Sequence, residues 1–303
     1  NVLHWASDDL SLQTRDFRER GRTGAIHIMT DAAGSITREE ARRLGITLLD
    51  SYVMTDDQAL PETLWETEDI YAALRAGKKI STAQSSEFER HQSYRRVLSQ
   101  YKRVLYLCVG SVYTGNYAVA CAWKQKNDPE DRLTVIDTTA ASGRLAVIVR
   151  AVARFAQKGE APAAVIAFAR NILMHSEEYI FLDRLKYLAA GGRLSRKGAF
   201  MGDMLHLKPV ISPTADGAKK VAAVHSREGQ IQFALRRLGE APRHSGTGEI
   251  LLQYSDNRDW VADVAQPRIR DHCPGVRIRV HPLSLTSGVH MGPGTWAVAF
   301  VRE

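Results

Sequence analysis

The chain has 303 residues, of which 44% are hydrophobic and 25% charged, a composition typical of a folded globular protein. No stretch approaches the roughly 18 consecutive apolar residues of a transmembrane helix, which excludes stable membrane insertion through such a helix. The net charge is +7 and the pI about 9.4, but the lysines and arginines are scattered in pairs without interleaved aromatic residues. We therefore expect a solvated basic surface and no nucleic-acid ligand. Such a surface would suit at most an acidic protein partner.

Residues 1–23 differ from the rest of the chain because they lack both an apolar signal-peptide core and an initiator Met. We interpret them as a linker or terminal extension, cut from a longer and possibly multidomain chain. We expect the protein to be cytoplasmic.

Residues 24–160 alternate short β-branched runs with amphipathic stretches, a pattern that predicts a parallel, Rossmann-like sheet with helices on both faces. The run at 104–109 is almost wholly apolar, as expected for a central parallel strand. The predicted strands are 25–29, 46–53, 104–109 and 133–136, and the predicted helices 37–44, 68–76, 87–102, 117–126 and 143–156.

A turn-rich segment at 158–162 predicts a domain boundary, beyond which residues 161–303 read as a second, mixed α/β domain. Asp216-Gly217 is a strong hairpin signal between two short strands. The predicted strands are 178–182, 209–211, 220–224, 250–254, 276–280 and 295–301, and the predicted helices 163–174, 230–238 and 258–270.

The three cysteines, Cys108, Cys121 and Cys273, have neither C-x-x-C spacing nor a metal-ligand pattern. Two of them fall in an apolar strand and a helix, where buried structural thiols are common. The sequence therefore predicts no disulfide framework, no metal site and no cofactor.

Four polar clusters fall at or near the ends of predicted strands or ahead of a helix, at the rim where open α/β sheets bind ligands. Each by itself is typical of a helix cap or a turn. Because four clusters share one sheet, we expect a common polar pocket. The clusters are Thr30-Asp31, residues 81–86, residues 110–116 and residues 137–139.

Two further segments combine glycines with a cationic or titratable side chain. Residues 188–193 end a helix in Gly191-Gly192-Arg193, which is either a C-cap with a solvated arginine or a donor for an anion. Residues 286–294 place His290 among three glycines, which predicts a loop before the last strand. That loop either approaches a ligand closely or is a turn with an incidental histidine.

Taken in order, these segments resemble the DegV family from about residue 25 to the C-terminus. The resemblance rests on seven short segments: Thr30-Asp31, residues 81–86, residues 113–117, Asp137-Thr138, residues 188–193, the Lys208-Pro209 strand with the Asp216-Gly217 turn, and residues 290–294.

The resemblance implies two α/β domains with a lipid pocket between them, holding one long-chain fatty acid of the palmitate or stearate class. It implies that hydroxyls and a histidine bind the carboxylate, and that further residues contact the head group or an acyl phosphate. Gly115, Gly292 and Gly294 would support the site. The implied carboxylate ligands are Ser81, Thr82, Ser111, Thr114 and His290, and the implied head-group residues are Arg193, Thr30 and Asp31.

The resemblance also implies a partner, because some members present their fatty acid to a separate kinase of the dihydroxyacetone kinase type. The chain would then be a carrier, with no catalytic residues of its own. Residues 81–86 depart from the usual motif at Ala83-Gln84, and residues 114–116 depart from theirs, but each segment keeps a hydroxyl. Residues 224–227 match the kinase-docking segment only loosely.

The alternative is a serine-type hydrolase using His290 with Ser81, Ser111 or Thr114 and either Asp31 or Asp137. No serine lies in a G-x-S-x-G elbow, and no phosphate-binding glycine motif occurs. We therefore favour the carrier.

Overall fold

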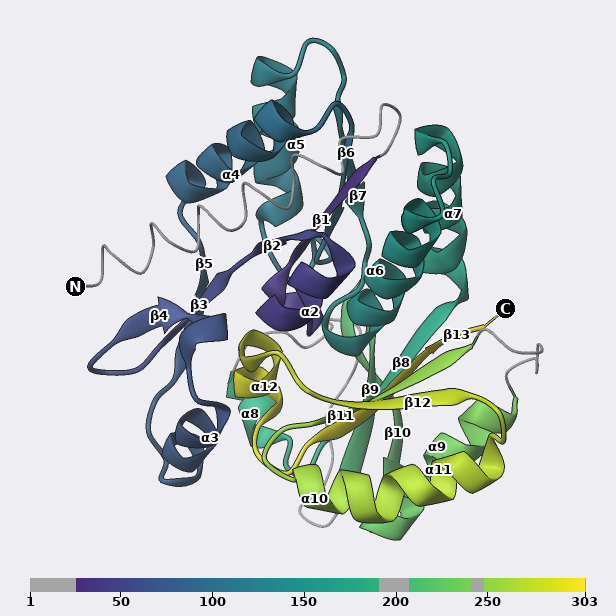
Figure 1. Cartoon of the computed structure of the whole chain (residues 1–303). Coiled ribbons are helices and arrows are strands. Elements are labelled where there is room, and N and C mark those ends of the chain that lie inside the picture. Colours follow the sequence, from purple (N-terminus) through teal and green to yellow (C-terminus); the bar gives the residue numbers. More distant parts are fainter. Residues whose placement is uncertain (1–25, 191–206, 241–247, 303) are drawn as a thin grey trace.

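The structure is a computed structural model, which describes residues 26–190, 207–240 and 248–302. The described chain forms a parallel sheet in its first half, a larger mixed sheet in its second half, and a small third sheet beside them (Figure 1). The two-domain α/β prediction of a parallel sheet followed by a mixed one is confirmed. The boundary at residue 160 stays a prediction.

The parallel sheet has the strand order β2-β1-β6-β7. Side chains of β6 alternate between two cores, as the two-residue period of a strand requires. Tyr106 packs under α4 and α5, whereas Leu105 and Leu107 pack under α6. The elements are β1 (His27–Asp31), β2 (Thr47–Leu49), β6 (Val104–Cys108), β7 (Leu133–Asp137), α2 (Arg38–Leu44), α4 (Glu87–Gln100), α5 (Asn116–Asn127) and α6 (Ser142–Gln157).

The mixed sheet has the order β10-β9-β8-β13-β11-β12, antiparallel except for the β11–β12 pair. Helices α9 and α11 cover one face, and α6 and α7 cover the other. Its elements are α7 (Pro162–His175), β8 (Ser176–Phe181), α8 (Lys186–Ala190), β9 (Lys208–Thr214), β10 (Gly217–Val224), α9 (Arg227–Gly239), β11 (Glu249–Tyr254), α10 (Arg258–Trp260), the π-helical turn η3 (Val261–Ala265), α11 (Gln266–His272), β12 (Arg277–Pro282) and β13 (Trp296–Val301).

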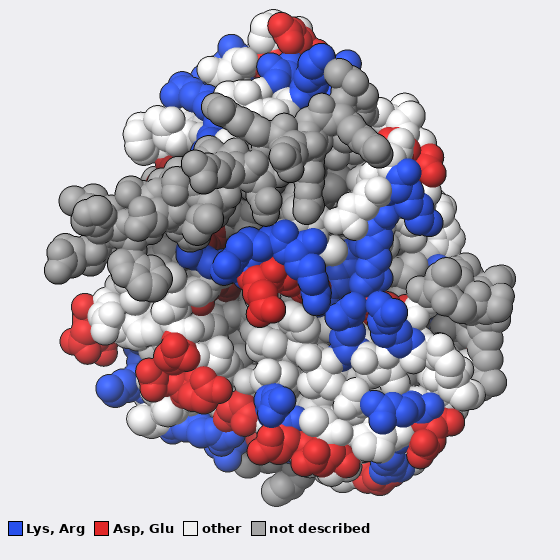
Figure 2. Space-filling view, viewed as in Figure 1, with Lys and Arg blue, Asp and Glu red and all other residues white. Residues whose placement is uncertain are grey.

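Helix α6 contacts both larger sheets, and a buried ion-pair network fixes it there. Arg150 on α6 donates two hydrogen bonds of 2.7 Å to Glu40 on α2 and lies 3.5 Å from Glu249 on β11. Above this network Lys and Arg side chains form a band over α2 and α6 (Figure 2). The buried carboxylates therefore tie the two halves together beneath a basic surface.

The strand predicted over residues 46–53 is divided at Asp50, because Thr47–Leu49 and Ser51–Met54 belong to two different sheets. The Asp50 carboxylate accepts hydrogen bonds from Arg38 at 3.0 Å and from Thr63 at 2.7 Å, and these contacts interrupt the strand. The second piece joins a small antiparallel sheet of order β4-β3-β5. This unit contains β3 (Ser51–Met54), β4 (Ala59–Pro61), the 3₁₀ turn η2 (Glu62–Leu64), α3 (Thr67–Arg75) and β5 (Ser81–Gln84).

The prediction of a loop over residues 286–294 is wrong in its first part. Residues Leu285–Met291 form helix α12, which follows β12 and precedes β13. The Ser284 hydroxyl caps the helix by accepting a hydrogen bond from the Ser287 N–H, and Gly292 ends it with a φ of +84°. Good capping at both ends outweighs the low helix propensity of the glycine and hydroxyl residues inside it.

Candidate functional site

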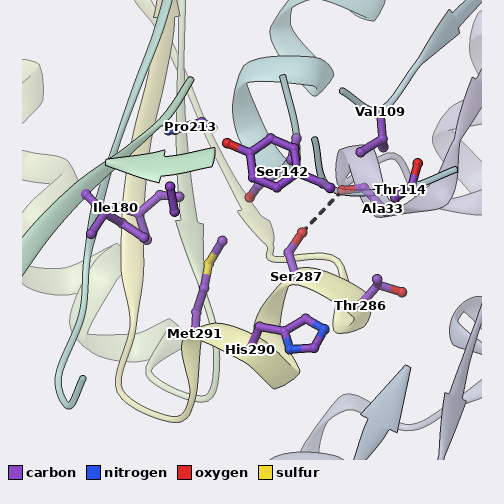
Figure 3. Close-up of a pocket in the computed structure, with 14 residues that line it drawn as sticks. Ala33, Val109, Thr114, Ser142, Ile180, Pro213, Thr286, Ser287, His290 and Met291 are labelled. Carbon is purple, nitrogen blue, oxygen red and sulfur yellow. Dashed lines mark hydrogen bonds between the residues drawn. The ribbon is translucent and has the colours of Figure 1, made fainter. Parts of the chain in front are cut away.

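A small cavity lies between the parallel sheet and the mixed sheet, next to the 3₁₀ turn η1 (Ala32–Gly34) and α12 (Figure 3). Its volume, measured for the centre of a water-sized sphere, is about 70 Å³. Its walls are mostly apolar, and its polar groups come chiefly from hydroxyls and one imidazole. The lining side chains include Ala33, Val109, Tyr113, Thr114, Ser142, Ile180, Ile211, Pro213, Ala218, Thr286, Ser287, His290 and Met291.

Helix α12 provides one wall of the cavity. Thr286 and His290 are four residues apart and so lie on the same side of the helix, whereas Met291 reaches toward the mixed sheet (Figure 3). His290 Nε2 shares a hydrogen bond of 2.9 Å with the Thr82 hydroxyl on β5. The small sheet thus supplies a hydroxyl that orients the imidazole beside the cavity.

The position of α12 follows from its contacts with the small sheet and α3. Glu62 is buried and accepts a 2.6 Å hydrogen bond from the Thr286 N–H in the first turn of α12, where a helix favours a negative charge. Burial nevertheless raises the pKa of Glu62 to about 7. A Cβ atom at Gly288 would collide with the Tyr71 hydroxyl, so this glycine lets α12 approach α3.

The structure brings together three of the five predicted carboxylate ligands. Thr114 and His290 line the cavity, and Thr82 contacts His290. Ser81 is exposed, since neighbouring residues of a strand point to opposite faces. Ser111 is also exposed, and its N–H donates a 3.0 Å hydrogen bond to Asp137. The assignment of Ser81 and Ser111 as ligands stays a prediction.

Thr30 and Asp31 lie fully buried at the end of β1. The Thr30 hydroxyl donates to the Leu107 carbonyl. Asp31 accepts hydrogen bonds from the Tyr106 hydroxyl at 2.6 Å and from the Asn116 amide at 2.9 Å, and burial still raises its pKa to about 6. These contacts hold the loop of residues 110–116, which carries Thr114, against the sheet.

The hydrolase triad drawn from the sequence is not assembled in the described residues. Asp31 bonds to Tyr106, Asn116 and the Val109 N–H, and Asp137 bonds to backbone N–H groups of the neighbouring loops. His290 is absent from both sets of partners.

The three predicted supporting glycines have different surroundings. At Gly292 a Cβ would collide with the Tyr187 ring, and φ is positive. Gly294 has a φ of +77° and its N–H donates a 2.6 Å hydrogen bond to Asp256. Gly115 precedes α5 and faces the Gln84 side chain. Gly191, Gly192 and Arg193 lie outside the described residues.

Sequence analysis missed Tyr113, Ser142, Thr286 and Ser287 as lining residues. Tyr113 and Ser142 show no signal of this role in the sequence, because only the fold turns them toward the cavity. Ser287 is buried and donates a 3.3 Å hydrogen bond to the Ala33 carbonyl (Figure 3). Treating residues 285–291 as a helix would have placed Thr286 beside His290 and identified it.

In the described ranges, no group of three or more His, Cys, Asp or Glu side chains is arranged to hold a metal ion. Among the same residues, no helix combines the length and apolarity needed to cross a bilayer.

Comparison with solved structures finds the same fold. A DegV family protein from Thermus thermophilus, described as binding fatty acid, superposes with a TM-score of 0.82 at 23% identity, covering 92% of this chain and 100% of that one. A stearic acid-binding protein from Eubacterium ventriosum gives a TM-score of 0.80 at 17% identity, covering 91% and 98%.

Comparison with known sequences finds DegV proteins that match nearly the full length of this chain. The DegV domain-containing protein YteA of Lactococcus lactis is 23% identical over 279 residues, covering 89% of this chain and 96% of that protein. The model of the family described as "Uncharacterised protein, DegV family" matches residues 25–303. The chain therefore belongs to the DegV family.

Proposed function

We propose that the protein binds one long-chain fatty acid, of the palmitate or stearate class, with its tail in the cavity and its carboxylate beside Thr82, Thr114 and His290. The observation that carries this proposal is a mostly apolar cavity lined by His290, whose imidazole shares a hydrogen bond with the Thr82 hydroxyl. Related proteins of the same fold are described as binding fatty acids, which supports the assignment.

The cavity suits the tail of such a ligand in chemistry and partly in size. The volume open to the centre of a water-sized sphere, about 70 Å³, exceeds the roughly 10–15 Å³ that one buried water occupies, so the cavity accommodates several methylene groups. Each methylene that it buries contributes roughly 0.8 kcal/mol. A longer chain requires neighbouring side chains to move, and the flexible thioether of Met291 is suited to this.

The hydroxyl and imidazole groups beside the cavity suit a carboxylate that must remain reactive. Hydroxyl and imidazole donors each contribute roughly 1.5–3 kcal/mol to a charged acceptor. Hydroxyls also rotate, so they can follow a carboxylate that becomes an acyl phosphate. This supports the second part of the proposal, that the protein acts as a carrier presenting its fatty acid to a fatty acid kinase, with Arg193 assisting at the acyl phosphate.

The proposal is tested by extracting the purified protein and measuring palmitate binding. We expect close to one fatty acid per chain in the extract. His290→Ala should weaken palmitate binding about tenfold or more, because it removes one donor and the partner that orients Thr82. The exposed His225 provides a matched control, and His225→Ala should bind as the unaltered protein does. A lipid-free chain that takes up no palmitate would refute the proposal.

A further inference from the structure

The mixed sheet contains a gap between β8 and β9. These strands pair only at Ile180–Ile211 and Phe181–Val210. Continuing the antiparallel register would place Glu178 opposite Pro213, and a proline has no N–H to donate to a neighbouring strand. Pairing ends before that position, so the first residues of β8 and the last residues of β9 separate.

Arg144, in the first turn of α6, occupies the gap. Its guanidinium donates to the Ser176 hydroxyl on β8 at 3.1 Å and to the Pro213 carbonyl on β9 at 3.3 Å. Its backbone N–H is fixed by a 3.1 Å hydrogen bond to Glu178. On the far side, the Tyr113 hydroxyl bonds both backbone groups of Thr214. The gap is therefore held open by side chains from the first half of the chain.

The gap opens into a cleft of about 670 Å³ that is lined mainly by polar atoms. Its charged lining is strongly unbalanced, with Glu177 as the one acidic side chain among the lining residues. Glu177 already pairs with Arg302 at 2.7 Å and lies 3.9 Å from Arg237. The cationic lining residues are Arg144, Lys219, Arg236 and Arg237.

Two of these cations are not engaged by carboxylates of the described chain. Lys219 is exposed on β10, and Arg236 is exposed on α9, where its guanidinium lies 5.2 Å from the Phe233 ring centre. Neither forms an ion pair with another described residue. A ligand in the cleft would thus meet two available positive charges, one from β10 and one from α9.

We propose that this cleft is a docking site for an extended, acidic segment of a partner protein, which enters beside β8 as an added strand. The β8 residues before Ile180 have no strand partner on the β9 side in the described chain, whereas the Pro213 carbonyl and both backbone groups of Thr214 on β9 are already bonded. An unpaired strand edge offers backbone groups to an incoming strand, and such pairing is a recurrent mode of peptide recognition. Lys219 and Arg236 select acidic side chains. Pro213 lines both this cleft and the lipid cavity, so the docked segment lies one residue away from the fatty acid.

The test measures how a fluorescently labelled peptide of sequence Gly-Glu-Val-Glu-Val-Glu-Gly binds to the full chain. Binding is measured by fluorescence anisotropy at low salt. We expect saturable binding that weakens at least tenfold when Lys219→Glu and Arg236→Glu are combined. The matched control is Arg42→Glu with Arg96→Glu, the same charge change at exposed positions on α2 and α4, which should change affinity less than twofold. No saturable binding, or equal losses in both double variants, would overturn the proposal.

Two further measurements distinguish strand addition from simple charge attraction. A peptide N-methylated at alternate residues keeps its charge but loses backbone donors, and it should bind at least tenfold more weakly. Equal binding of this peptide, or displacement by inorganic phosphate at the same charge concentration, would show a small-anion site instead. If the charge-reversal variant does not fold, Lys219→Gln with Arg236→Gln provides the same comparison, with an expected loss of about fivefold.

Discussion

The apolar cavity and the basic cleft lie on either side of Pro213, yet they are opposite in character. The cavity lies between two sheets and takes its walls from buried Ile180, Ile211 and Val109. The cleft lies within one sheet, where β8 and β9 separate, and its walls are arginines, a lysine and hydroxyls. Space between sheets excludes water and suits an acyl chain, whereas space within a splayed sheet stays open and suits a charged, extended ligand.

The first turn of α6 contributes to both spaces. Ser142 lines the cavity, and Arg144, two residues later, lines the cleft. Glu178 fixes this turn by accepting hydrogen bonds from the Gly143 and Arg144 N–H groups, and burial raises its pKa to about 7. Glu62 likewise accepts a hydrogen bond from the Thr286 N–H in the first turn of α12, and burial raises its pKa to about 7. Each space therefore depends on a helix whose first turn is held by a buried carboxyl group.

The largest expected effect comes from filling the cavity. Ala218→Leu adds three carbon atoms to a buried side chain that lines the small cavity. We expect palmitate binding to fall more than 30-fold, while binding of the acidic peptide in the cleft changes less than twofold. Ala223→Leu, at an exposed position on the same strand, serves as the control. Parallel losses of both ligands would show that the two spaces are not independent.

The next effect concerns Glu62 and the pH dependence of stability. The pKa of this carboxyl group is raised from 4.5 to about 7, so its contribution to stability is fully present below pH 4.5 and is lost as the pH rises through 7. We expect Glu62→Gln to remove this dependence, which amounts to about 3 kcal/mol between pH 4.5 and 8. Urea unfolding at several pH values measures it. The exposed Glu66→Gln should keep the original profile, and identical profiles for all three proteins would contradict the assignment.

The smallest effect is expected from Glu177→Gln at the cleft. This change removes the acidic lining residue and releases Arg302 from its ion pair, whereas Arg237 keeps its 2.6 Å ion pair with Glu240, so the cleft becomes more positive. Because these groups are partly exposed and screened, we expect the acidic peptide to bind only about two- to threefold more tightly. Palmitate binding should not change. The exposed Glu228→Gln is the control, and a gain that persists at high salt would argue against an electrostatic origin.

Local sequence patterns predicted most of the secondary structure and the order of the two sheets. The apolar run around Leu105 and the strand–helix alternation depend on periodicity within a few residues, so they can be read without the fold. The same holds for the Asp216-Gly217 hairpin. Two of the differences, at Asp50 and at Leu285–Met291, arose where distant polar partners decided the local structure.

The contacts that define the candidate site were not determined by sequence patterns alone. The resemblance named Thr82, Thr114 and His290 as ligands, but Thr82 and His290 are 208 residues apart in the chain, and only packing of α12 against the small sheet brings them together. The cleft is equally a property of the tertiary structure. Pro213 is visible in the sequence, but the residue it faces across the sheet is set by strand register, which depends on long-range pairing.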